Sequence, residues 1–498
     1  MNRTKVIGLF LGPLLFIYFF FIFKSEGLSP EAQATLACAS WIAVWWTTEV
    51  IPIAATALLP ILLFPLTGAL SLAETTSSYG HKYIFLFVGG FIIAIAIEKW
   101  NLHRRIALNI ISLIGTSVNR IILGFMVATA FLSMWISNTA TTVMMLPIAM
   151  AIVTQLKDNP ITKANENLVF GKGLMLAIAY AASIGGIATL IGTPPNLVLA
   201  GVLEESYGVE ITFLQWMKFG LPISILLLII CWYYLTHYAF AGKGDMRMPK
   251  SFPGGKKEVK RLLNELGIIS REEKIILSIF SLAAFCWMFR TYLLQPFLPA
   301  IDDTIIAIFF AIILFIIPAK KDKQGRLLNW EEAVKLPWGI LLLYGGGLAL
   351  ASGFSETGLA HWIGEQLITI QNISLLLLVL ILVAAVNFLT EITSNLATTA
   401  MLLPVIVPVA LIFDVHPYIL MVGVTVSASC AFMLPVATPP NAIVFGSGYL
   451  RIPDMVRTGV WLNIISIILI TAITYFALPY IWNFIPDVFP AEFGLKFD

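Results

Sequence analysis

The sequence predicts an all-α polytopic membrane protein with about eleven transmembrane helices, arranged as two inverted repeats that each contain a re-entrant hairpin. Three observations support this prediction. The chain is 59% hydrophobic and only 12% charged, whereas roughly a quarter of the residues in a soluble domain are charged. Apolar runs long enough to cross a bilayer recur along the chain. Two polar motifs, each present twice, lie inside apolar sequence. Lipid is therefore the expected solvent for most of the chain.

The apolar runs give the candidate membrane spans. The first, residues 5–23, follows two basic residues as a signal peptide would, but it is longer than a typical signal-peptide core. Ser25-Glu26-Gly27 also provides no small-residue cleavage site, so we interpret the run as a span. The other candidates are residues 33–49, 51–67, 82–98, 173–206, 217–239, 274–292, 302–319, 336–354, 416–448 and 457–481.

Two further apolar stretches, residues 122–155 and 374–412, are too broken to be simple spans. Each is interrupted by a Ser-Asn pair, at Ser137-Asn138 and at Ser394-Asn395. Serine and asparagine side chains hydrogen-bond the local backbone in non-helical conformations, so the pair favours a helix break. We predict that each stretch is a re-entrant hairpin, which enters and leaves the membrane on one side.

An amphipathic segment precedes each hairpin, at residues 100–115 and 358–369. The first mixes polar residues such as His103 and Arg105 with apolar ones. This pattern is typical of a helix that lies along the membrane surface. A short helical extension of the preceding span is the alternative.

An internal repeat relates the two halves of the chain. Gly89-Gly90 recurs as Gly346-Gly347, and Ser137-Asn138 recurs as Ser394-Asn395, both at an offset of 257 residues. Thr-Pro-Pro-Asn occurs at residues 193–196 and again at residues 438–441, an offset of 245. The first half therefore carries twelve extra residues between its two motifs, which we place in a surface loop at residues 158–167.

The distribution of lysine and arginine predicts the topology, because cytoplasmic loops carry an excess of basic residues. With the N-terminus in the cytoplasm, most basic groups fall on the cytoplasmic side and the C-terminus lies outside. These groups are Lys99, Arg104 and Arg105; Lys157, Lys163 and Lys172; Lys243 to Lys274; Lys320 to Arg326; and Arg451. The first hairpin then opens inside and the second outside. The lysine-rich residues 241–275 would form a cytoplasmic link between the repeats.

The paired motifs have the chemistry of a binding site. Two successive prolines remove two backbone donors and are expected to stop the incoming helix. A broken helix leaves free backbone groups, which a membrane tolerates only when they are buried in protein or line a cavity. N-terminal ends of half-helices attract anions, while carbonyl, hydroxyl and asparagine oxygens suit a hard cation such as sodium. A single motif would indicate a polar kink or a loop, but broken helices in both halves are typical of a secondary transporter.

Other reactive residues give weaker signals. The four cysteines and five histidines show no metal-ligand spacing, so neither a zinc site nor metalloenzyme chemistry is predicted. The net charge of +2 does not indicate a nucleic-acid partner.

Two glutamates lie in apolar surroundings. Glu49, at the junction of two spans, is explained as well by interfacial exposure as by function. Glu391 lies one helical turn before Asn395, where it could orient the motif, complete a cation site or serve a purely structural role.

At these motifs the chain resembles the divalent anion–sodium symporter (DASS) family of INDY-type di- and tricarboxylate transporters, and particularly its bacterial sodium-dicarboxylate members. The resemblance runs from Trp41-Ile42-Ala43 and residues 49–56 to Pro440-Asn441-Ala442-Ile443. It implies a homodimer in the bacterial inner membrane, which imports C4-dicarboxylates such as succinate, malate or fumarate together with sodium. It also implies a fixed scaffold domain and a transport domain that moves as an elevator.

The same resemblance implies a division of the chain. Scaffold helices would comprise residues 1–81 and 209–335, with the cytoplasmic link at residues 241–275. Transport elements would comprise residues 82–208 in the first repeat and 336–450 in the second, with hairpins at residues 122–155 and 374–412. Residues 451–498 would form a last helix and the tail.

Site residues are carried over motif by motif. The resemblance implies a first sodium site at Ser133, Ser137, Asn138 and Gly192, and a second at Thr390, Thr393, Asn395 and Ala437. Substrate carboxylates would be surrounded by Asn138, Thr139 and Asn395, with Thr193, Pro194, Thr438 and Pro439. One position departs from the family pattern, because Leu396 stands where a threonine is expected. A hydroxyl is thereby lost beside the second carboxylate, so a larger or less polar dicarboxylate is an alternative substrate.

Three alternative functions remain open. A sodium-independent dicarboxylate exchanger, such as a 2-oxoglutarate/succinate or malate antiporter, could use the same fold with its cation sites lost or filled by a protein cation. No lysine or arginine occurs within either Ser-Asn motif, and Ser133 and Thr390 supply oxygen atoms, which favours symport. An intramembrane enzyme would need a catalytic constellation, and none is visible in the sequence. A channel or receptor is the third alternative.

Overall fold

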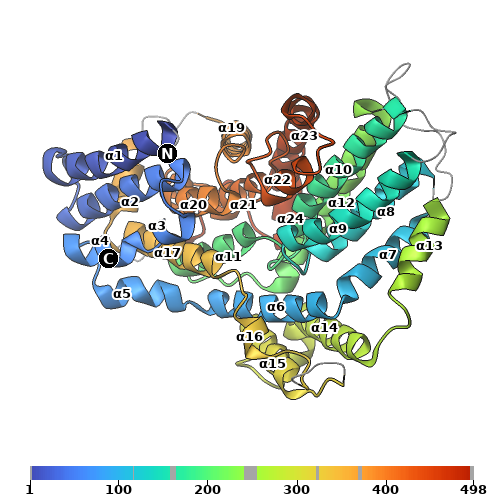
Figure 1. Ribbon diagram of the computed structural model, residues 1–498. Coiled ribbons are helices and arrows are strands. Elements are labelled where there is room, and N and C mark those ends of the chain that lie inside the picture. The colour runs from blue at the N-terminus through green and yellow to red at the C-terminus, as the bar shows by residue number, and fades with distance from the viewer. Residues whose placement is uncertain are drawn as a thin grey trace.

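The computed structural model describes residues 3–115, 117–157, 164–240, 255–320, 325–367 and 373–493. Within these ranges the regular elements are all helices, and no strand is present (Figure 1). Eight helices in the described ranges are long and apolar enough to cross a membrane, and five shorter apolar helices accompany them. The predicted all-α polytopic fold is therefore confirmed.

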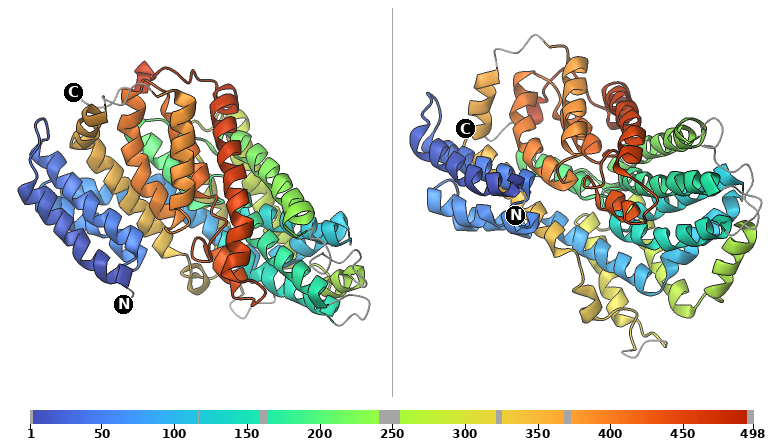
Figure 2. Two further views of the ribbon diagram at one scale, coloured as in Figure 1. Left: turned by 90° about the horizontal axis from the view of Figure 1, so that it is seen from above. Right: turned by 45° about the horizontal axis from the view of Figure 1, so that its top comes forward.

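The N-terminal helices form one side of the molecule, away from the first-repeat helices (Figure 2). Gln33 on the second helix joins it to the end of the first. Its side-chain amide nitrogen, Nε2, donates to the carbonyl oxygens of Phe19 (2.9 Å) and Phe23 (2.7 Å). These elements are α1 (Arg3–Ile17), η1 (Tyr18–Ile22), α2 (Pro30–Thr48), α3 (Ile53–Thr56), α4 (Leu59–Thr67), α5 (Leu72–Ser77) and η2 (Ser78–Gly80). Helix α6 (Lys82–Lys99) follows, begins the first repeat and packs against α15 and α7.

The first repeat continues through the predicted hairpin. Its helices are α7 (Leu102–Ile114), α8 (Val118–Ser133), α9 (Asn138–Lys157), α10 (Ala164–Gly186) and α11 (Pro194–Tyr207). Both α8 and α9 pack against α10. The predicted stretch 122–155 is therefore confirmed as two helices with a break between them.

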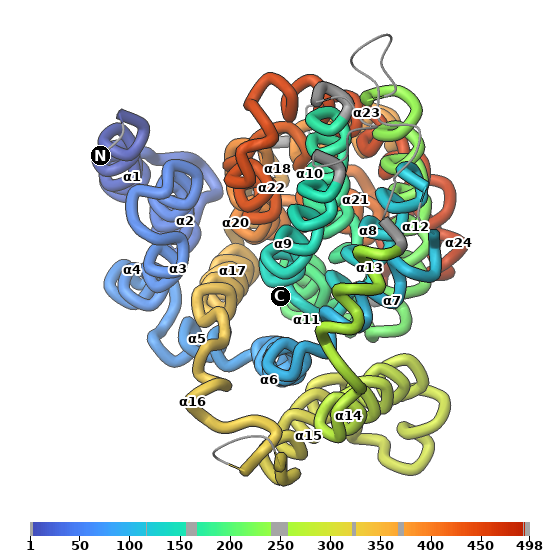
Figure 3. The backbone as a smooth tube through the Cα atoms, turned by 45° about the vertical axis from the view of Figure 1, so that its right-hand side comes forward, coloured from blue at the N-terminus to red at the C-terminus, as the bar shows by residue number. Residues whose placement is uncertain are grey.

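The middle of the chain contains α14 and α15, which lie beneath α6 (Figure 3). In contrast, α12 packs against α10 and α8 of the first repeat. The elements are α12 (Phe213–Tyr234), η3 (Leu235–Ala239), α13 (Gly255–Glu265), α14 (Arg271–Phe289), η5 (Arg290–Leu294), α15 (Asp303–Ile316) and α16 (Trp330–Ala333).

The second repeat follows the same order as the first. Its helices are α17 (Trp338–Glu356), α18 (Leu359–Leu367), α19 (Leu375–Leu389), α20 (Asn395–Ile412), α21 (Pro417–Ala428) and α22 (Pro439–Phe445). The chain then continues with α23 (Ile452–Ala472), η7 (Ile473–Ala477), α24 (Leu478–Trp482) and η8 (Ala491–Phe493). The predicted stretch 374–412 is again two helices separated by a break.

Two of the predicted single spans are wrong. Residues 173–206 form parts of α10 and α11, and residues 416–448 contain α21 and α22, so each stretch holds two helices separated by a loop. Breaks were expected at the Ser-Asn pairs and at the Thr-Pro-Pro motifs, yet each of these two stretches was still interpreted as a single span. Each repeat therefore contains two interrupted helical segments rather than one.

The amphipathic segments form separate helices, α7 and α18. Asn101 precedes α7 with φ of 56°, and Gly358 precedes α18 with φ of 76°. A left-handed residue ends an α-helix, so these segments are not extensions of the preceding spans. Asn101 and Gly358 are themselves related by the repeat offset of 257 residues. Their predicted position along the membrane surface stays a prediction.

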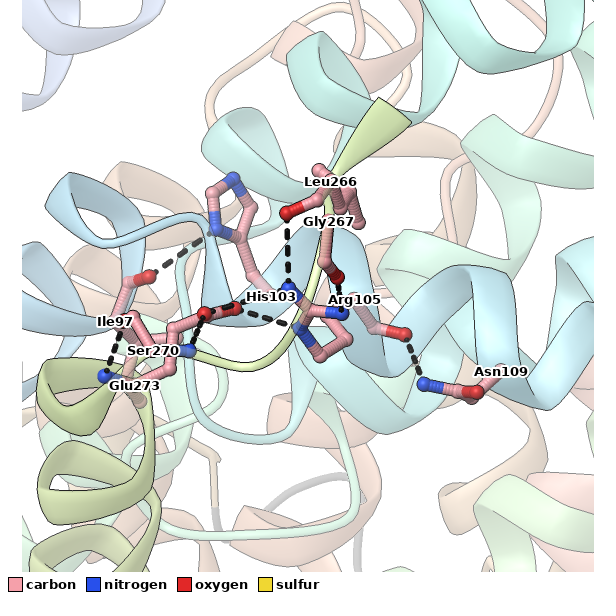
Figure 4. Close-up of polar contacts among 8 residues, drawn as sticks. All are labelled: Ile97, His103, Arg105, Asn109, Leu266, Gly267, Ser270 and Glu273. Atoms are coloured by element: carbon pink, nitrogen blue, oxygen red, sulfur yellow. Dashed lines mark hydrogen bonds and ion pairs between the residues drawn. The ribbon is translucent and has the colours of Figure 1, made fainter. Parts of the chain in front are cut away.

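Each amphipathic helix is fixed to a loop outside its own repeat. The Arg105 guanidinium on α7 makes two bonds to the Glu273 carboxylate (2.7 and 3.3 Å) and donates to the carbonyl oxygens of Leu266 and Gly267 (Figure 4). At the same repeat position on α18, Trp362 donates from its indole N–H to the carbonyl oxygen of Glu26 (3.3 Å). Both helices are therefore anchored through corresponding residues.

We predict that Arg105→Ala loosens the anchor of α7. The substitution leaves the largely buried Glu273 carboxylate without its charged partner, which costs about 1–3 kcal/mol. A melting experiment on the purified protein should show a Tm several degrees below that of the unmodified protein. Arg104→Ala is the control, because Arg104 is the neighbouring arginine and makes no such bonds to Glu273. Equal Tm values for the two variants would contradict an anchoring role.

Candidate functional site

Each Ser-Asn pair lies where one helix ends and the next begins. In the first repeat α8 ends at Ser133 and α9 begins at Asn138. In the second repeat α19 ends at Leu389 and α20 begins at Asn395. The predicted helix break is therefore confirmed in both halves, and each asparagine stands at the N-terminus of the second helix.

Each Thr-Pro-Pro motif begins a helix instead of stopping one. Thr193 and Thr438 are the N-caps of α11 and α22, both with φ of −142°. Pro194 and Pro439 follow in the first helical turn, where the missing backbone N–H would have had no partner in any case. The incoming helices end earlier, so the expectation that the prolines stop them is wrong.

An asparagine closes the loop in front of each of these helices. Asn196 and Asn441, three residues after the N-caps, each donate from Nδ2 to carbonyl oxygens of the preceding loop, and Asn196 makes an additional, longer bond to the Ile187 carbonyl oxygen (3.5 Å). The acceptors are Gly186 (3.1 Å) and Thr189 (2.7 Å) for Asn196, and Ala431 (3.2 Å) and Leu434 (3.0 Å) for Asn441. The two sets of acceptors correspond at the offset of 245. Each motif asparagine thus provides hydrogen-bond donors to backbone carbonyl groups of the non-helical loop. Neither asparagine was selected from the sequence as a site residue.

We define the first half-site as Ser133, Ser137, Asn138, Gly186 and Gly192. Two of its side-chain oxygen atoms have no hydrogen-bond partner among the described residues. The Ser133 hydroxyl and Asn138 Oδ1 are buried and make no hydrogen bond among the described residues. A Cβ atom on Gly186 would lie 2.8 Å from Asn138 Oδ1 and 3.1 Å from the Gly192 carbonyl oxygen. Two oxygens therefore converge beside the Gly186 Cα atom, where any larger residue would intrude. Their neutral character fits a hard monovalent cation.

We define the second half-site as Thr390, Thr393, Asn395 and Ala437. Its side-chain oxygen atoms form hydrogen bonds with one another and with neighbouring groups. The Thr390 hydroxyl lies 2.7 Å from Asn395 Oδ1 and 2.9 Å from the Ala428 carbonyl oxygen. The Thr393 hydroxyl lies 2.9 Å from the Leu389 carbonyl oxygen. The structure brings Thr390 and Asn395 together as expected, in a more fully bonded arrangement than the first half-site.

The two half-sites are joined by packing between the repeats. Helix α9 of the first hairpin packs against α22, and α20 of the second hairpin packs against α11 (Figure 3). The buried Tyr180 hydroxyl on α10 also donates to the Phe432 carbonyl oxygen (2.8 Å). Each hairpin therefore packs on the helix that follows the Thr-Pro-Pro motif of the other repeat.

The residues that follow the two motif asparagines differ in exposure. Thr139 is exposed, whereas Leu396 at the corresponding position is only 6% exposed and belongs to the hydrophobic core. The departure from the family pattern thus places an apolar side chain at a buried position.

Glu391 connects three elements, a role that the sequence analysis left open. Its carboxylate accepts hydrogen bonds from three consecutive backbone N–H groups, and from Nδ2 of Asn463 on α23 (2.7 Å). The backbone donors are Phe432 (2.7 Å), Met433 (2.9 Å) and Leu434 (3.0 Å). All four partners therefore donate to the oxygen atoms of one buried side chain. Glu391 therefore fixes the second hairpin to the loop before α22.

The first repeat lacks this carboxylate. Met134 stands at the position that corresponds to Glu391, and the Thr189 hydroxyl donates to its backbone carbonyl oxygen (2.5 Å). Asn463 was missed because α23 contains no motif. A lone asparagine in an apolar helix was the only sequence signal for it.

Glu49 is not part of either half-site. It is exposed and ends α2 with a left-handed backbone, at φ 48° and ψ 46°. The structure therefore supports the interpretation of Glu49 as a residue of an exposed turn between two helices. Within the described ranges no group of three histidine, cysteine, aspartate or glutamate residues is placed to hold a metal ion.

The fold and the paired half-sites define a membrane transporter built from two repeats with interrupted helices. The family model for the sodium:sulfate symporter transmembrane region matches residues 3–482. The chain belongs to this family, which corresponds to the DASS resemblance, and it is a transporter rather than an enzyme.

Close relatives carry a more specific name. The sodium-dependent dicarboxylate transporter SdcS of Staphylococcus saprophyticus is 48% identical over 483 residues, which cover 96% of this chain and 92% of the relative. SdcS of Staphylococcus aureus strain RF122 is 48% identical over 485 residues, with the same coverage. Both alignments extend over nearly the whole chain, including both repeats.

Two solved transporter structures share the fold. MtrF of Neisseria gonorrhoeae, described as one of a class of antimetabolite efflux pumps, aligns with a TM-score of 0.58 and 12% identity over 95% of this chain and 98% of its own. The YdaH transporter of Alcanivorax borkumensis aligns with a TM-score of 0.52 and 12% identity over 78% and 86%. At this level of identity the likeness concerns the fold alone.

We predict that Glu391→Gln weakens the second half-site. Glutamine replaces one acceptor oxygen by an NH₂ group, which would face backbone donors and lose at least one of the four bonds. In transport assays the concentration of co-transported cation for half-maximal rate should rise about tenfold, while Asn463→Ala should give a smaller rise.

The control for this prediction is Glu356→Gln, because Glu356 is an exposed glutamate at the end of α17. It should leave the cation dependence unchanged. If Glu391→Gln lowers only the maximal rate and leaves the cation dependence as it was, the carboxylate does not position the half-site.

Proposed function

We propose that the chain imports C4-dicarboxylates such as succinate, malate and fumarate by sodium symport. The observation that carries this proposal is the pair of buried, unpartnered oxygens of Ser133 and Asn138 in the first half-site. Unwound backbone carbonyls and neutral side-chain oxygens are the ligands that bind sodium in transporters with broken helices. The name of the relatives, which are 48% identical, also supports this choice of cation and substrate.

The proposal assigns roles to the residues of both repeats. Helix N-termini at Asn138, Asn395 and Pro194 favour the negative charge of a carboxylate. The first sodium site comprises Ser133, Ser137, Asn138 and Gly192, and the second comprises Thr390, Thr393, Asn395 and Ala437. The dicarboxylate contacts Asn138, Thr139, Asn395, Thr193, Pro194, Thr438 and Pro439. The contacts of α9 with α22 and of α11 with α20 support a site shared by the two repeats.

We further propose that the hairpins and interrupted helices move together as an elevator against a scaffold of N-terminal helices. The mutual packing of α9, α11, α20 and α22 supports their movement as one unit. The anchors of α7 and α18 to loops outside their repeats support fixed ends for this movement. A homodimer in the bacterial inner membrane, with the N-terminus in the cytoplasm and the C-terminus outside, completes the proposal.

Uptake of radiolabelled succinate into proteoliposomes tests the proposed function. The vesicles contain no internal dicarboxylate, and uptake is compared with and without an inward sodium gradient. Concentrative uptake that requires sodium is the expected result. Uptake that occurs only after preloading with unlabelled dicarboxylate, with no effect of sodium, would show an exchanger and contradict the proposed sodium sites.

We predict that Ser133→Ala separates cation binding from stability. The Ser133 hydroxyl is buried without a partner among the described residues, so its removal should leave the Tm unchanged or higher. The sodium concentration for half-maximal succinate uptake should rise about tenfold, which corresponds to about 1.4 kcal/mol.

Ser224→Ala is the matched control for Ser133→Ala. The Ser224 hydroxyl is also buried but donates to the Ile184 carbonyl oxygen (2.8 Å), so this variant should lower the Tm without changing the sodium dependence. Equal sodium dependence in both variants would remove Ser133 from the cation site.

We predict that Leu396→Thr increases the preference for succinate over 2-oxoglutarate and citrate in competition assays. Threonine restores a hydroxyl beside the proposed second carboxylate site, where it can donate a hydrogen bond. Leu403→Thr makes the same change at a buried position two turns further along α20, and should lower stability without altering the ranking. An unchanged ranking in Leu396→Thr would exclude Leu396 as a selectivity determinant.

A further inference from the structure

A cavity of about 720 Å³ lies outside both half-sites, between α10, the end of α12 with η3, and α23. Its walls combine charged groups with aromatic rings. The residues that matter for its chemistry are Lys172, Asp454, Arg457, Tyr234, Tyr238 and Trp461.

The charges in this cavity do not balance. Lys172 and Asp454 form an ion pair of 2.8 Å, and both side chains are largely covered. Arg457, one turn further along α23, is exposed and makes no ion pair or hydrogen bond among the described residues. One positive charge therefore stands free at the cavity mouth, and an anion would neutralise it.

The apolar part of the cavity has the character of a membrane interface. Tyr238 and Trp461 are 67% and 57% exposed, and tyrosine and tryptophan are enriched where headgroups meet acyl chains. Further along α23, Ile468 is also exposed, so an apolar surface continues away from the charged mouth. Tyr234 forms the inner wall, held by the bond from its hydroxyl to the Thr458 carbonyl oxygen (3.1 Å).

The three helices meet at the ends that the topology places in the cytoplasm. The cavity is lined by the beginning of α10, the end of α12 and the beginning of α23. The chain after Phe240 enters the lysine-rich residues 241–275, and Arg451 precedes α23. The π-helical turn η3 forms one wall, and π-helical turns are frequent at functional sites.

We propose that this cavity binds an anionic phospholipid of the cytoplasmic leaflet. The lipid phosphate pairs with Arg457, and an acyl chain lies along Trp461 and the exposed face of α23. Basic pockets between transmembrane helices on this side of a membrane suit such headgroups. A zwitterionic lipid carries the same phosphate, but its ammonium group neutralises the negative charge of that phosphate. The attraction between its headgroup and the Arg457 guanidinium is therefore weaker. The proposal rests on the cytoplasmic orientation given under the proposed function, and its test does not depend on transport.

Native mass spectrometry of the purified protein tests the proposal with phosphatidylglycerol and phosphatidylethanolamine of identical acyl chains. The protein should retain about fivefold more phosphatidylglycerol, the selectivity expected from one basic residue at a membrane surface. Arg457→Gln should abolish this preference, and Arg457→Lys should keep most of it because the charge remains. Lys218→Gln is the control, since it removes an exposed charge from the opposite end of α12 and should change nothing.

Equal retention of the two lipids by the unmodified protein would overturn the proposal, as would an unchanged preference in Arg457→Gln. Displacement of bound phosphatidylglycerol by inorganic phosphate would show that the cavity takes a small phosphate anion and would overturn the lipid assignment. Retention of phosphatidylglycerol in a protein that fails to take up succinate would leave the lipid site standing and contradict only the proposed function.

Discussion

Unpaired backbone groups cannot be left in hydrocarbon, where each costs several kcal/mol, and this constraint governs every interruption in the fold. Asn196 and Asn441 supply donors to the carbonyl oxygens of the two loops before α11 and α22. Glu391 supplies an acceptor to three consecutive N–H groups of the second loop. These polar residues in an apolar chain are explained first by the backbone that they satisfy. The oxygens of Ser133 and Asn138, which have no partner among the described residues, are the ones assigned to the proposed cation site.

The interrupted helices of the two repeats pack against each other. Each hairpin contacts the helix that begins at the other repeat's Thr-Pro-Pro motif, so the half-sites belong to one packed unit. The amphipathic helices α7 and α18 lie at the edges of this unit and are bonded to loops elsewhere in the chain. A left-handed residue before each of them breaks the helical connection to the preceding span. The fold thus separates a polar centre from its outer attachments.

The sequence predicted those features whose signals are local. The Ser-Asn breaks, the repeat offset and the separate amphipathic segments all follow from residue types within a few positions. The loops before the Thr-Pro-Pro motifs, within residues 173–206 and 416–448, were missed because hydropathy records composition, and these loops are as apolar as the helices. The prolines were taken as terminators, although they occupy the first turn of the next helix. The partners of Glu391 lie at least 41 residues away, so no local pattern could reveal them.

A duplicated sequence need not produce two equal binding environments. The second repeat holds the buried Glu391 side chain, which accepts hydrogen bonds from the loop before α22, and the first repeat has Met134 at the same position. The loop before α22 is held to its hairpin through a carboxyl group, whereas in the first repeat the Thr189 hydroxyl makes the contact with the hairpin. The twofold relation of the chain path thus coexists with two different ways of fastening a loop to its hairpin, which an exact duplication would not provide.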